Sequence, residues 1–384
     1  MTSSCDYLKC CVLLSLVMNF VIDRKLLYQP LQKVVGILSG RPRMPILTHV
    51  LLEVNDNCLC ITATDLEIEI TVRVILQNKY SIESVTVPGR KFFEICRSLS
   101  ESSKISIVSK DKKLIICSGY SKFYLSTFSS LDFPKLEKWD NNLKLVISQA
   151  TLKKMIELTQ FAMGHQDVRY CLNGILFETK EHVLRIVATD GHRLASCEIT
   201  MDLLLPNQSS IIPRKGVIEI LRLLNVKEKL VNIQTNNNNL RMETENYTFT
   251  SKLIDAVFPN CHDVFVKCSK NVLEVECDIL RQSLKRAAIL ANEKLRIVRF
   301  TLITNQLKIT AHNFEHEASE EILDVLYSGQ SMKISFNVDY LIDVLQVMDT
   351  QFLRFYLTNE ISSVQIEGTE KCYGATYIVM PIRV

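Results

Sequence analysis

The stretch "KLVISQATLKKMIELTQFAM" (144–163) changes its apolar period in the middle. Its beginning has apolar residues at a period of two, which is typical of a half-buried strand. From there on, apolar residues stand three and four apart, which indicates one face of an amphipathic helix. The sequence therefore predicts a strand that is followed directly by a helix.

The same change of period occurs twice more, in "NFVIDRKLLYQPLQKVVGIL" (19–38) and "VLEVECDILRQSLKRAAILA" (272–291). The three copies begin at residues 19, 144 and 272, so their starts lie 125 and 128 residues apart. A repeat of this length is a full domain and not a solenoid unit. A chain of 384 residues also exceeds what one hydrophobic core usually serves.

A second helix is expected later in each copy, and its start has a repeated signature. Pro88 and Pro213 stand 125 residues apart, and we expect each in the first helical turn, where its missing amide costs nothing. Asn337 takes the matching place in the third copy and keeps a good cap. The three stretches are "VPGRKFFEICRSL" (87–99), "IPRKGVIEILRLL" (212–224) and "FNVDYLIDVLQVM" (336–348).

These repeats predict an α+β fold of three similar domains, each with two helices and several strands. Strand pairs at 51–65, 175–190 and 300–313 complete each copy. The expected domain boundaries are 18–142, 143–270 and 271–384.

The segment "VATDGHR" (187–193) suggests catalysis, because Asp190 stands two residues before His192. A carboxylate that orients an imidazole is part of a nucleophilic triad, so a hydrolase is one alternative. However, "ITATDLE" (61–67) has the same Ala-Thr-Asp without a histidine, and Asn313 occupies the matching place in the third copy. A turn-forming Asp or Asn after a strand explains all three positions.

No other pattern supports chemistry. The sequence has no G-x-S-x-G, HExxH or glycine-rich phosphate loop. Thirteen cysteines are scattered without a CxxC pair, so we expect reduced thiols and no zinc site. We therefore predict no catalytic residue, no metal and no cofactor.

The charge differs between the predicted domains. Residues 18–142 carry 17 Lys and Arg against 13 Asp and Glu, whereas residues 271–384 carry 11 against 15. The acidic run "EHEASEE" (315–321) in the third domain complements a basic first domain. This pattern favours a head-to-tail contact, which closes into a ring when the rotation permits. Lys and Arg also recur on the predicted helices, which suggests a face held near phosphates without base reading.

The ordered motifs identify a family. The chain resembles the bacterial DNA polymerase III beta subunits, the replicative sliding clamps, over residues 18–384. The resemblance rests on motifs such as "GRPRMPIL" (40–47), "HQDVRYCLNG" (165–174), "ATDGHRLA" (188–195) and "YIVMPIRV" (377–384).

The resemblance implies that each repeat is a DNA-clamp domain with two helices packed on antiparallel sheets. It further implies a head-to-tail homodimer of six domains in a ring around duplex DNA, which is held without sequence preference. The implied DNA contacts are Arg41, Gln166 and Tyr170, while Cys171 replaces a tyrosine of the family. The implied interface residues are Lys91, Lys122, Phe123, Leu125, Ile289, Leu290, Glu315 and Glu317.

The resemblance also implies a hydrophobic cleft between the second and third domains that docks short peptides. The implied partners are the replicative DNA polymerase alpha subunit, clamp-loader subunits, translesion polymerases, mismatch-repair proteins and ligase. Asp263 and Leu295 depart from the family, so the cleft rim is expected to favour somewhat different peptides. The matching cleft residues are Arg169, Leu172, Thr189, Gly191, His192, Arg193, Leu194, Pro259, Val264, Ser363, Ile378, Met380, Pro381, Ile382 and Arg383.

Two expectations concern the N-terminus and the cellular context. The apolar run "CVLLSLVMNFVI" (11–22) is too short to span a bilayer and lacks a cleavage site, so we expect a cytoplasmic protein with no membrane partner. Family members begin near Met18, so residues 1–17 are expected to be a non-structural extension. A monomeric peptide-binding adaptor without DNA encirclement is the remaining alternative function.

Overall fold

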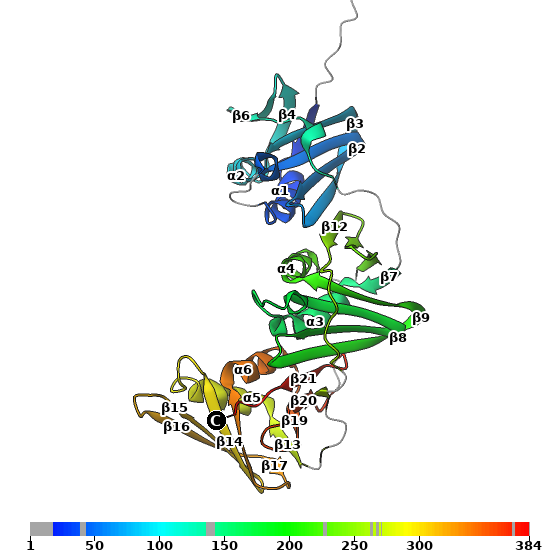
Figure 1. The fold of residues 1–384 in the computed structure, drawn as a ribbon. Coiled ribbons are helices and arrows are strands. Elements are labelled where there is room, and N and C mark those ends of the chain that lie inside the picture. The colour runs from blue at the N-terminus through cyan, green and yellow to red at the C-terminus, as the bar shows by residue number, and fades with distance from the viewer. Residues whose placement is uncertain are drawn as a thin grey trace, which may run out of the picture. The chain divides into compact units, whose positions relative to one another are not determined.

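The computed structural model describes residues 18–38, 44–135, 143–225, 229–261, 264–265, 269, 271–370 and 373–383. The chain divides into two compact units (Figure 1). One comprises Met1–Lys138 with Glu243–Thr250, and the other comprises Trp139–Met242 with Ser251–Val384. The expected extension 1–17 lies outside the described residues. In the described ranges, no helix is long and apolar enough to cross a membrane.

The first unit contains the first repeat. A four-stranded antiparallel sheet has the order β1-β4-β5-β6, and a long hairpin joins β2 to β3. Helix α1 buries Leu27, Leu31 and Val34, and α2 buries Phe92 and Cys96. The elements are β1 (Asn19–Asp23), α1 (Arg24–Val35), β2 (His49–Thr64), β3 (Ile68–Pro88), α2 (Gly89–Ser98), β4 (Lys104–Lys110), β5 (Lys113–Ser118) and β6 (Ser121–Ser126).

The second and third repeats make up most of the second unit. The second repeat has β7 (Leu143–Ser148), α3 (Gln149–Thr159), β8 (Gly174–Thr189), β9 (Arg193–Pro213), α4 (Arg214–Leu223), β10 (Leu230–Thr235), β11 (Asn239–Glu243) and β12 (Tyr247–Lys252). The third has β13 (Asn271–Glu276), α5 (Cys277–Ala287), β14 (Ile297–Ile303), β15 (Gln306–His312), β16 (Ala318–Asp324), β17 (Leu326–Tyr327), β18 (Met332–Asn337), α6 (Val338–Val347), β19 (Phe352–Leu357), β20 (Val364–Gly368) and β21 (Thr376–Val379). The predicted strand-then-helix pattern and the second helix are thus confirmed in all three repeats.

One sheet joins the second and third repeats. Its strand order is β17-β13-β19-β20-β21-β9-β8, so β21 at the end of the chain pairs antiparallel with β9 of the second repeat. Ile378 lies opposite Leu194, and Val379 lies opposite Arg193. This shared sheet explains why the two repeats fall into one compact unit. It also brings the C-terminal residues to the segment that contains His192.

The helix starts agree with the sequence in one case and differ in two. Asn337 caps α6, because its side-chain oxygen accepts hydrogen bonds from the amides of Asp339 and Tyr340. Pro88 and Pro213 precede α2 and α4 as cap residues, one position before the first turn. The expected placement in the turn is therefore wrong by one residue. A proline is compatible with either place, since the amide it lacks has no helical partner at the cap or in the first turn.

The turns at Asp65, Asp190 and Asn313 share one kind of hydrogen bonding, from nearby backbone amides to the side-chain oxygen. Asp65 Oδ1 accepts from the amides of Glu67 and Ile68, and Asp190 Oδ1 accepts from those of His192 and Arg193. Asn313 Oδ1 accepts from the amides of Glu315 and Glu317. The structure thus confirms the turn interpretation of all three positions.

Candidate functional site

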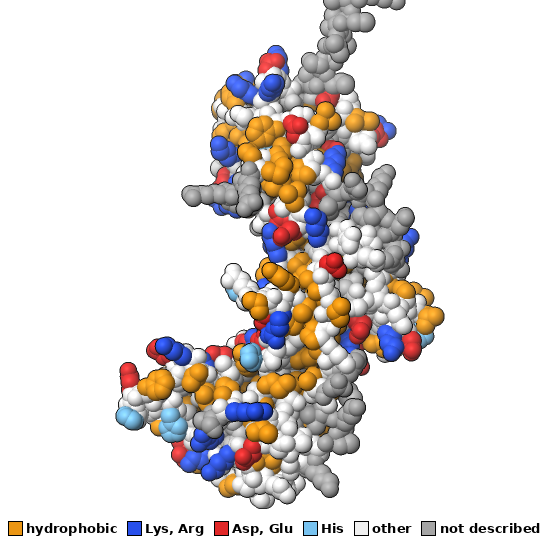
Figure 2. Space-filling model, in the orientation of Figure 1, with side chains coloured by type: hydrophobic (Ala, Val, Ile, Leu, Met, Phe, Trp, Pro, Cys, Tyr) orange, Lys and Arg blue, Asp and Glu red, His pale blue; other side chains and the backbone are white. Residues whose placement is uncertain are grey.

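A cleft with an apolar floor lies in the second unit. Its volume is about 180 Å³. Leu172, Leu194 and Ile378 are buried at its floor, and the partly buried Val264 packs against the cluster that contains Leu194 and Ile378. Figure 2 shows hydrophobic side chains gathered on the visible face of this unit. The residues that line the cleft are Arg169, Leu172, Thr189, Gly191, His192, Arg193, Leu194, Pro259, Asn260, Cys261, Val264, Ile378 and Met380.

Separate segments form this cleft. The short 3-10 helix Tyr170–Leu172 supplies one wall, and the turn between β8 and β9 supplies another. The tail after β21 closes the third side, because the Met380 amide donates to the His192 carbonyl oxygen at 2.9 Å. The cleft therefore depends on the pairing of β21 with β9.

Gly191 permits close packing within the turn. Its φ of +87° lies in the left-handed region, which favours glycine. A Cβ atom at this position would lie 3.0 Å from Nη1 and Nη2 of Arg169. Any larger residue would therefore require the Arg169 guanidinium to shift.

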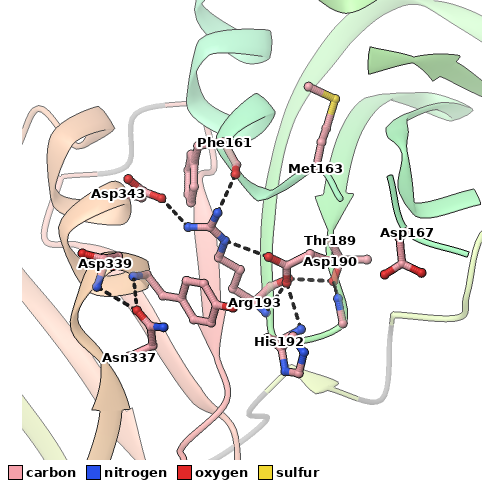
Figure 3. Close-up of polar contacts among 12 residues, drawn as sticks. Phe161, Met163, Asp167, Thr189, Asp190, His192, Arg193, Asn337, Asp339 and Asp343 are labelled. Atoms are coloured by element: carbon pink, nitrogen blue, oxygen red, sulfur yellow. Dashed lines mark hydrogen bonds and ion pairs between the residues drawn. The ribbon is translucent and has the colours of Figure 1, made fainter. Parts of the chain in front are cut away.

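Arg193 is the most connected side chain of the site (Figure 3). Its Nε donates to Asp190 Oδ2 at 3.1 Å, and its Nη2 donates to the Phe161 carbonyl oxygen at 2.8 Å. Its Nη1 donates to Asp343 Oδ2 at 2.5 Å. The guanidinium carbon also lies 4.6 Å from the centre of the Tyr340 ring. Only 12% of the Arg193 side chain is exposed, so a paired cation is held in the cleft wall.

Arg169 is paired as well. Its Nε and Nη2 donate to the two carboxylate oxygens of Asp167 at 3.1 and 2.9 Å, and Nη2 also donates to the Asp190 carbonyl oxygen. The hydrogen bonds from Arg169 lower the pKa of the Asp167 carboxyl to about 2. Asp167 therefore stays charged and keeps Arg169 neutralised at any physiological pH.

The hydrolase interpretation fails on geometry. The Asp190 carboxylate accepts from two backbone amides and from Arg193, and no hydrogen bond joins it to the His192 ring. The His192 ring instead stacks on Tyr340, with centroids 6.4 Å apart. Among the described residues, no group of three or more His, Cys, Asp or Glu could hold a metal ion.

Most predicted cleft residues meet in the cleft, and a few do not line it. Ser363 supports the wall from behind, since its hydroxyl donates to the Val264 carbonyl oxygen at 3.2 Å. The Ile382 amide donates to the Ser335 carbonyl oxygen on β18, so the chain turns away beyond Met380. Pro381, Ile382 and Arg383 are therefore absent from the lining.

Two lining residues were not predicted, and one residue expected at the cleft rim lies elsewhere. Asn260 and Cys261 line the cleft, and their position directly after Pro259 is the signal that identifies them. Leu295 does not reach this cleft and lies in a separate hollow beside Phe314, so its expected effect on the rim is wrong. Asp263 lies outside the described residues.

Two of the three predicted DNA-contacting residues lie in the described part of the chain. Arg41 lies outside the described residues. Gln166 is exposed and has a φ of +55°, and Tyr170 is 76% exposed. Cys171 is half-buried and packs against the cleft core, so this position offers no aromatic ring to a ligand.

The predicted interface residues lie on the two units. Lys91 and Lys122 are exposed and Phe123 is half-buried, whereas Leu125 is only 8% exposed and belongs largely to the core. In the third repeat Ile289 is 76% exposed and Leu290 is half-buried. Glu315 and Glu317 are exposed on the loop before β16.

Comparisons with known proteins give one consistent result. Three families match the chain, described as the N-terminal domain (residues 18–137), the central domain (146–260) and the C-terminal domain (262–383) of the DNA polymerase III beta subunit. The beta sliding clamp of Salmonella typhimurium is 49% identical over 366 residues, which cover 95% of this chain and 100% of the relative. That of Proteus mirabilis is 49% identical over 367 residues, with the same coverage.

Solved structures agree. The DNA polymerase III subunit beta from Pseudomonas aeruginosa matches with a TM-score of 0.93 at 40% identity, covering 96% of this chain and 100% of its own. A structure of the sliding clamp from the same organism bound to griselimycin matches with the same TM-score, identity and coverage. Family, relatives and structures agree over nearly the whole chain, and the chain belongs to the DNA polymerase III beta subunit family of sliding clamps.

Proposed function

We propose that this sliding clamp tethers replication and repair proteins by docking their short apolar segments in the cleft at Leu172, Leu194 and Ile378. The observation that carries the proposal is an open apolar floor between paired arginines. Concave, mostly apolar sites with a few fixed polar groups are the usual form of a ligand site. The griselimycin complex of the Pseudomonas aeruginosa relative supports a ligand site in this family.

The proposed partners are the replicative DNA polymerase alpha subunit, clamp-loader subunits, translesion polymerases, mismatch-repair proteins and ligase. Each would contribute a short segment whose apolar side chains fill the cleft. The clamp itself carries out no chemistry in this proposal, and it acts in the cytoplasm. Ser363, Pro381, Ile382 and Arg383 would act behind the cleft or at its outer end.

The chain is proposed to assemble as a head-to-tail homodimer that closes a ring around duplex DNA. Two edge strands support this arrangement, since β6 ends the sheet of the first repeat and β16 ends the last sheet of the third. Exposed edge strands offer unpaired backbone groups to another chain. Lys122 on β6 and the acidic β16, with Glu320 and Asp324, have complementary charges. The interface would cover Ile289 and Leu290, with Lys91 facing Glu315 and Glu317.

A ring needs little affinity for the DNA that it encloses. Gln166, Tyr170 and Arg41 are proposed to touch the DNA weakly, so that the ring slides. The domain limits 18–142, 143–270 and 271–384 belong to this proposal, with one clamp domain in each.

The docking proposal is tested by changing the cleft without changing the ring. Val264→Ser places a hydroxyl on the apolar lining, and Val257→Ser makes the same change at a residue that is 92% exposed and does not line the cleft. We expect Val264→Ser to weaken binding of griselimycin and of the purified polymerase alpha subunit at least about tenfold, as for anchoring contacts. Val257→Ser should bind as the unmodified chain does. Equal binding by all three proteins, measured by calorimetry, would place the docking site elsewhere.

The ring proposal is tested by DNA topology. Protein loaded by a clamp loader should stay on circular DNA in moderate salt and leave the same DNA after linearisation. Ordinary electrostatic binding weakens steeply with salt and does not depend on DNA ends. Equal retention on both forms would indicate ordinary electrostatic binding, whereas a monomeric mass in solution would favour the monomeric adaptor.

A further inference from the structure

We propose that Asp343 on α6 is a positioning residue for peptide docking, although it does not line the cleft. It would act through Arg193, whose guanidinium it holds in the cleft wall. This inference rests on the proposed docking function and adds a residue of the third repeat to it.

The Arg193 guanidinium donates hydrogen bonds to three acceptors. Arginine has five N–H groups in a planar fork. Nε is used by Asp190 and Nη2 by the Phe161 carbonyl oxygen, both from the second repeat. Nη1 is used by Asp343 from the third repeat. Asp343 is thus the carboxylate that ties this fork to α6 (Figure 3).

The contact with Asp343 is connected to the cleft turn through shared partners. Asp190 binds the Arg193 fork through Oδ2 and the amides of His192 and Arg193 through Oδ1. The His192 carbonyl oxygen in turn accepts from the Met380 amide. A shift of the Arg193 guanidinium would therefore displace Asp190, the turn between β8 and β9, and the tail after β21 together. Coupling of this kind requires contiguous contacts, and every step here is a hydrogen bond.

The removal of Asp343 has a specific consequence. Arg193 would keep its hydrogen bonds to Asp190 and Phe161 but lose the Asp343 carboxylate on α6. Its Nη1 would then have no acceptor from α6 and would require another one. The cleft lies beside it, because Arg193 itself is a lining residue. A guanidinium that turns into the cleft would be hydrated above the apolar floor. An apolar ligand could then bind only if that water were removed, which costs free energy.

The same helix offers a matched control. Asp339 lies one turn earlier on α6 and binds Arg296 with both carboxylate oxygens at 2.9 Å. Neither Asp339 nor Arg296 lines the cleft. Asp339→Ala therefore removes an Arg–Asp pair from α6 as Asp343→Ala does, and it leaves the Arg193 contacts in place.

The experiment compares Asp343→Ala, Asp343→Asn and Asp339→Ala in the full-length dimer. Griselimycin is the probe, and its dissociation constant is measured by calorimetry. We expect Asp343→Ala to weaken binding about tenfold, because the released guanidinium must leave the apolar floor before the ligand can bind there. Asp343→Asn keeps an acceptor for Nη1, so we expect a loss of less than about threefold. Asp339→Ala should bind as the unmodified chain does.

Amide hydrogen exchange distinguishes positioning from general destabilisation. The amides of His192 and Arg193 should exchange faster in Asp343→Ala and at the original rate in Asp339→Ala. Unchanged affinity in Asp343→Ala, or an equal loss in Asp339→Ala, would overturn the inference. If the unmodified chain itself fails to bind griselimycin or the polymerase alpha subunit, the proposed function fails first. The two failures are therefore separable.

Discussion

Replacement of Ile289 by alanine should weaken the proposed dimer. Ile289 is 76% exposed in the protomer, so most of the residue is available for burial by a partner. Full burial of an isoleucine side chain contributes about 1.5–3 kcal/mol, and alanine retains only its methyl group. We therefore expect a loss of about 1.5 kcal/mol per interface. A head-to-tail dimer has two such interfaces, so the total is about 3 kcal/mol, or a dissociation constant raised about 100-fold.

Sedimentation velocity across a dilution series measures this change. Ile361→Ala is the control, because Ile361 is also an exposed isoleucine, at 61%, and is not among the predicted interface residues. The melting temperature of the protomer should hardly change in either variant, since an exposed side chain contributes little to its own fold. A dimer that survives dilution equally well in Ile289→Ala and in the unmodified protein would refute the interface assignment.

Other predictions concern the first unit, the turn and the tail. Burial lowers the pKa of His49 to about 4 from 6.5, so below pH 6.5 the unfolded chain takes up a proton that the folded chain excludes. Stability should fall from pH 6.5 to pH 4, and His49→Phe should flatten that part of the urea-midpoint profile; a profile of the same slope would exclude His49 as its cause. Asp190→Ala should lower the free energy of unfolding by about 1–3 kcal/mol through two lost turn bonds, and an unchanged urea midpoint would contradict this. Deletion of residues 380–384 should abolish griselimycin binding and leave the dimer intact by sedimentation, whereas loss of the dimer would make the tail structural.

Local signals explain what the sequence could predict. The change of apolar period is set by neighbours a few residues apart, so the strand and helix of each repeat could be expected before the structure. Asp65, Asp190 and Asn313 were predictable as turns for the same reason, since a side chain that bonds amides two to four residues ahead needs no distant partner.

Long-range pairing explains what the sequence could not predict. Residue spacing does not indicate that β21 pairs with β9, although this pairing builds the cleft. Nor does it indicate that Arg193 binds Asp343, which lies 150 residues away. The lining residues were expected through the family resemblance, and Asn260 and Cys261 were missed because they are not among the matching family positions, although they directly follow Pro259.

The comparison of two equivalent turns shows how a structural repeat becomes a binding site. In the first repeat Thr64 accepts from the Leu66 amide, and in the second Thr189 accepts from the Gly191 amide, each at 3.1 Å. Leu66 and Gly191 both have a positive φ, +77° and +87°, so a side chain is tolerated at this turn in the first repeat. A Cβ atom at position 191 would lie 3.0 Å from both terminal nitrogens of Arg169, so the guanidinium would have to shift to admit it. The absence of a side chain at Gly191 therefore lets Arg169 pack directly against the second turn, where it forms one wall of the cleft.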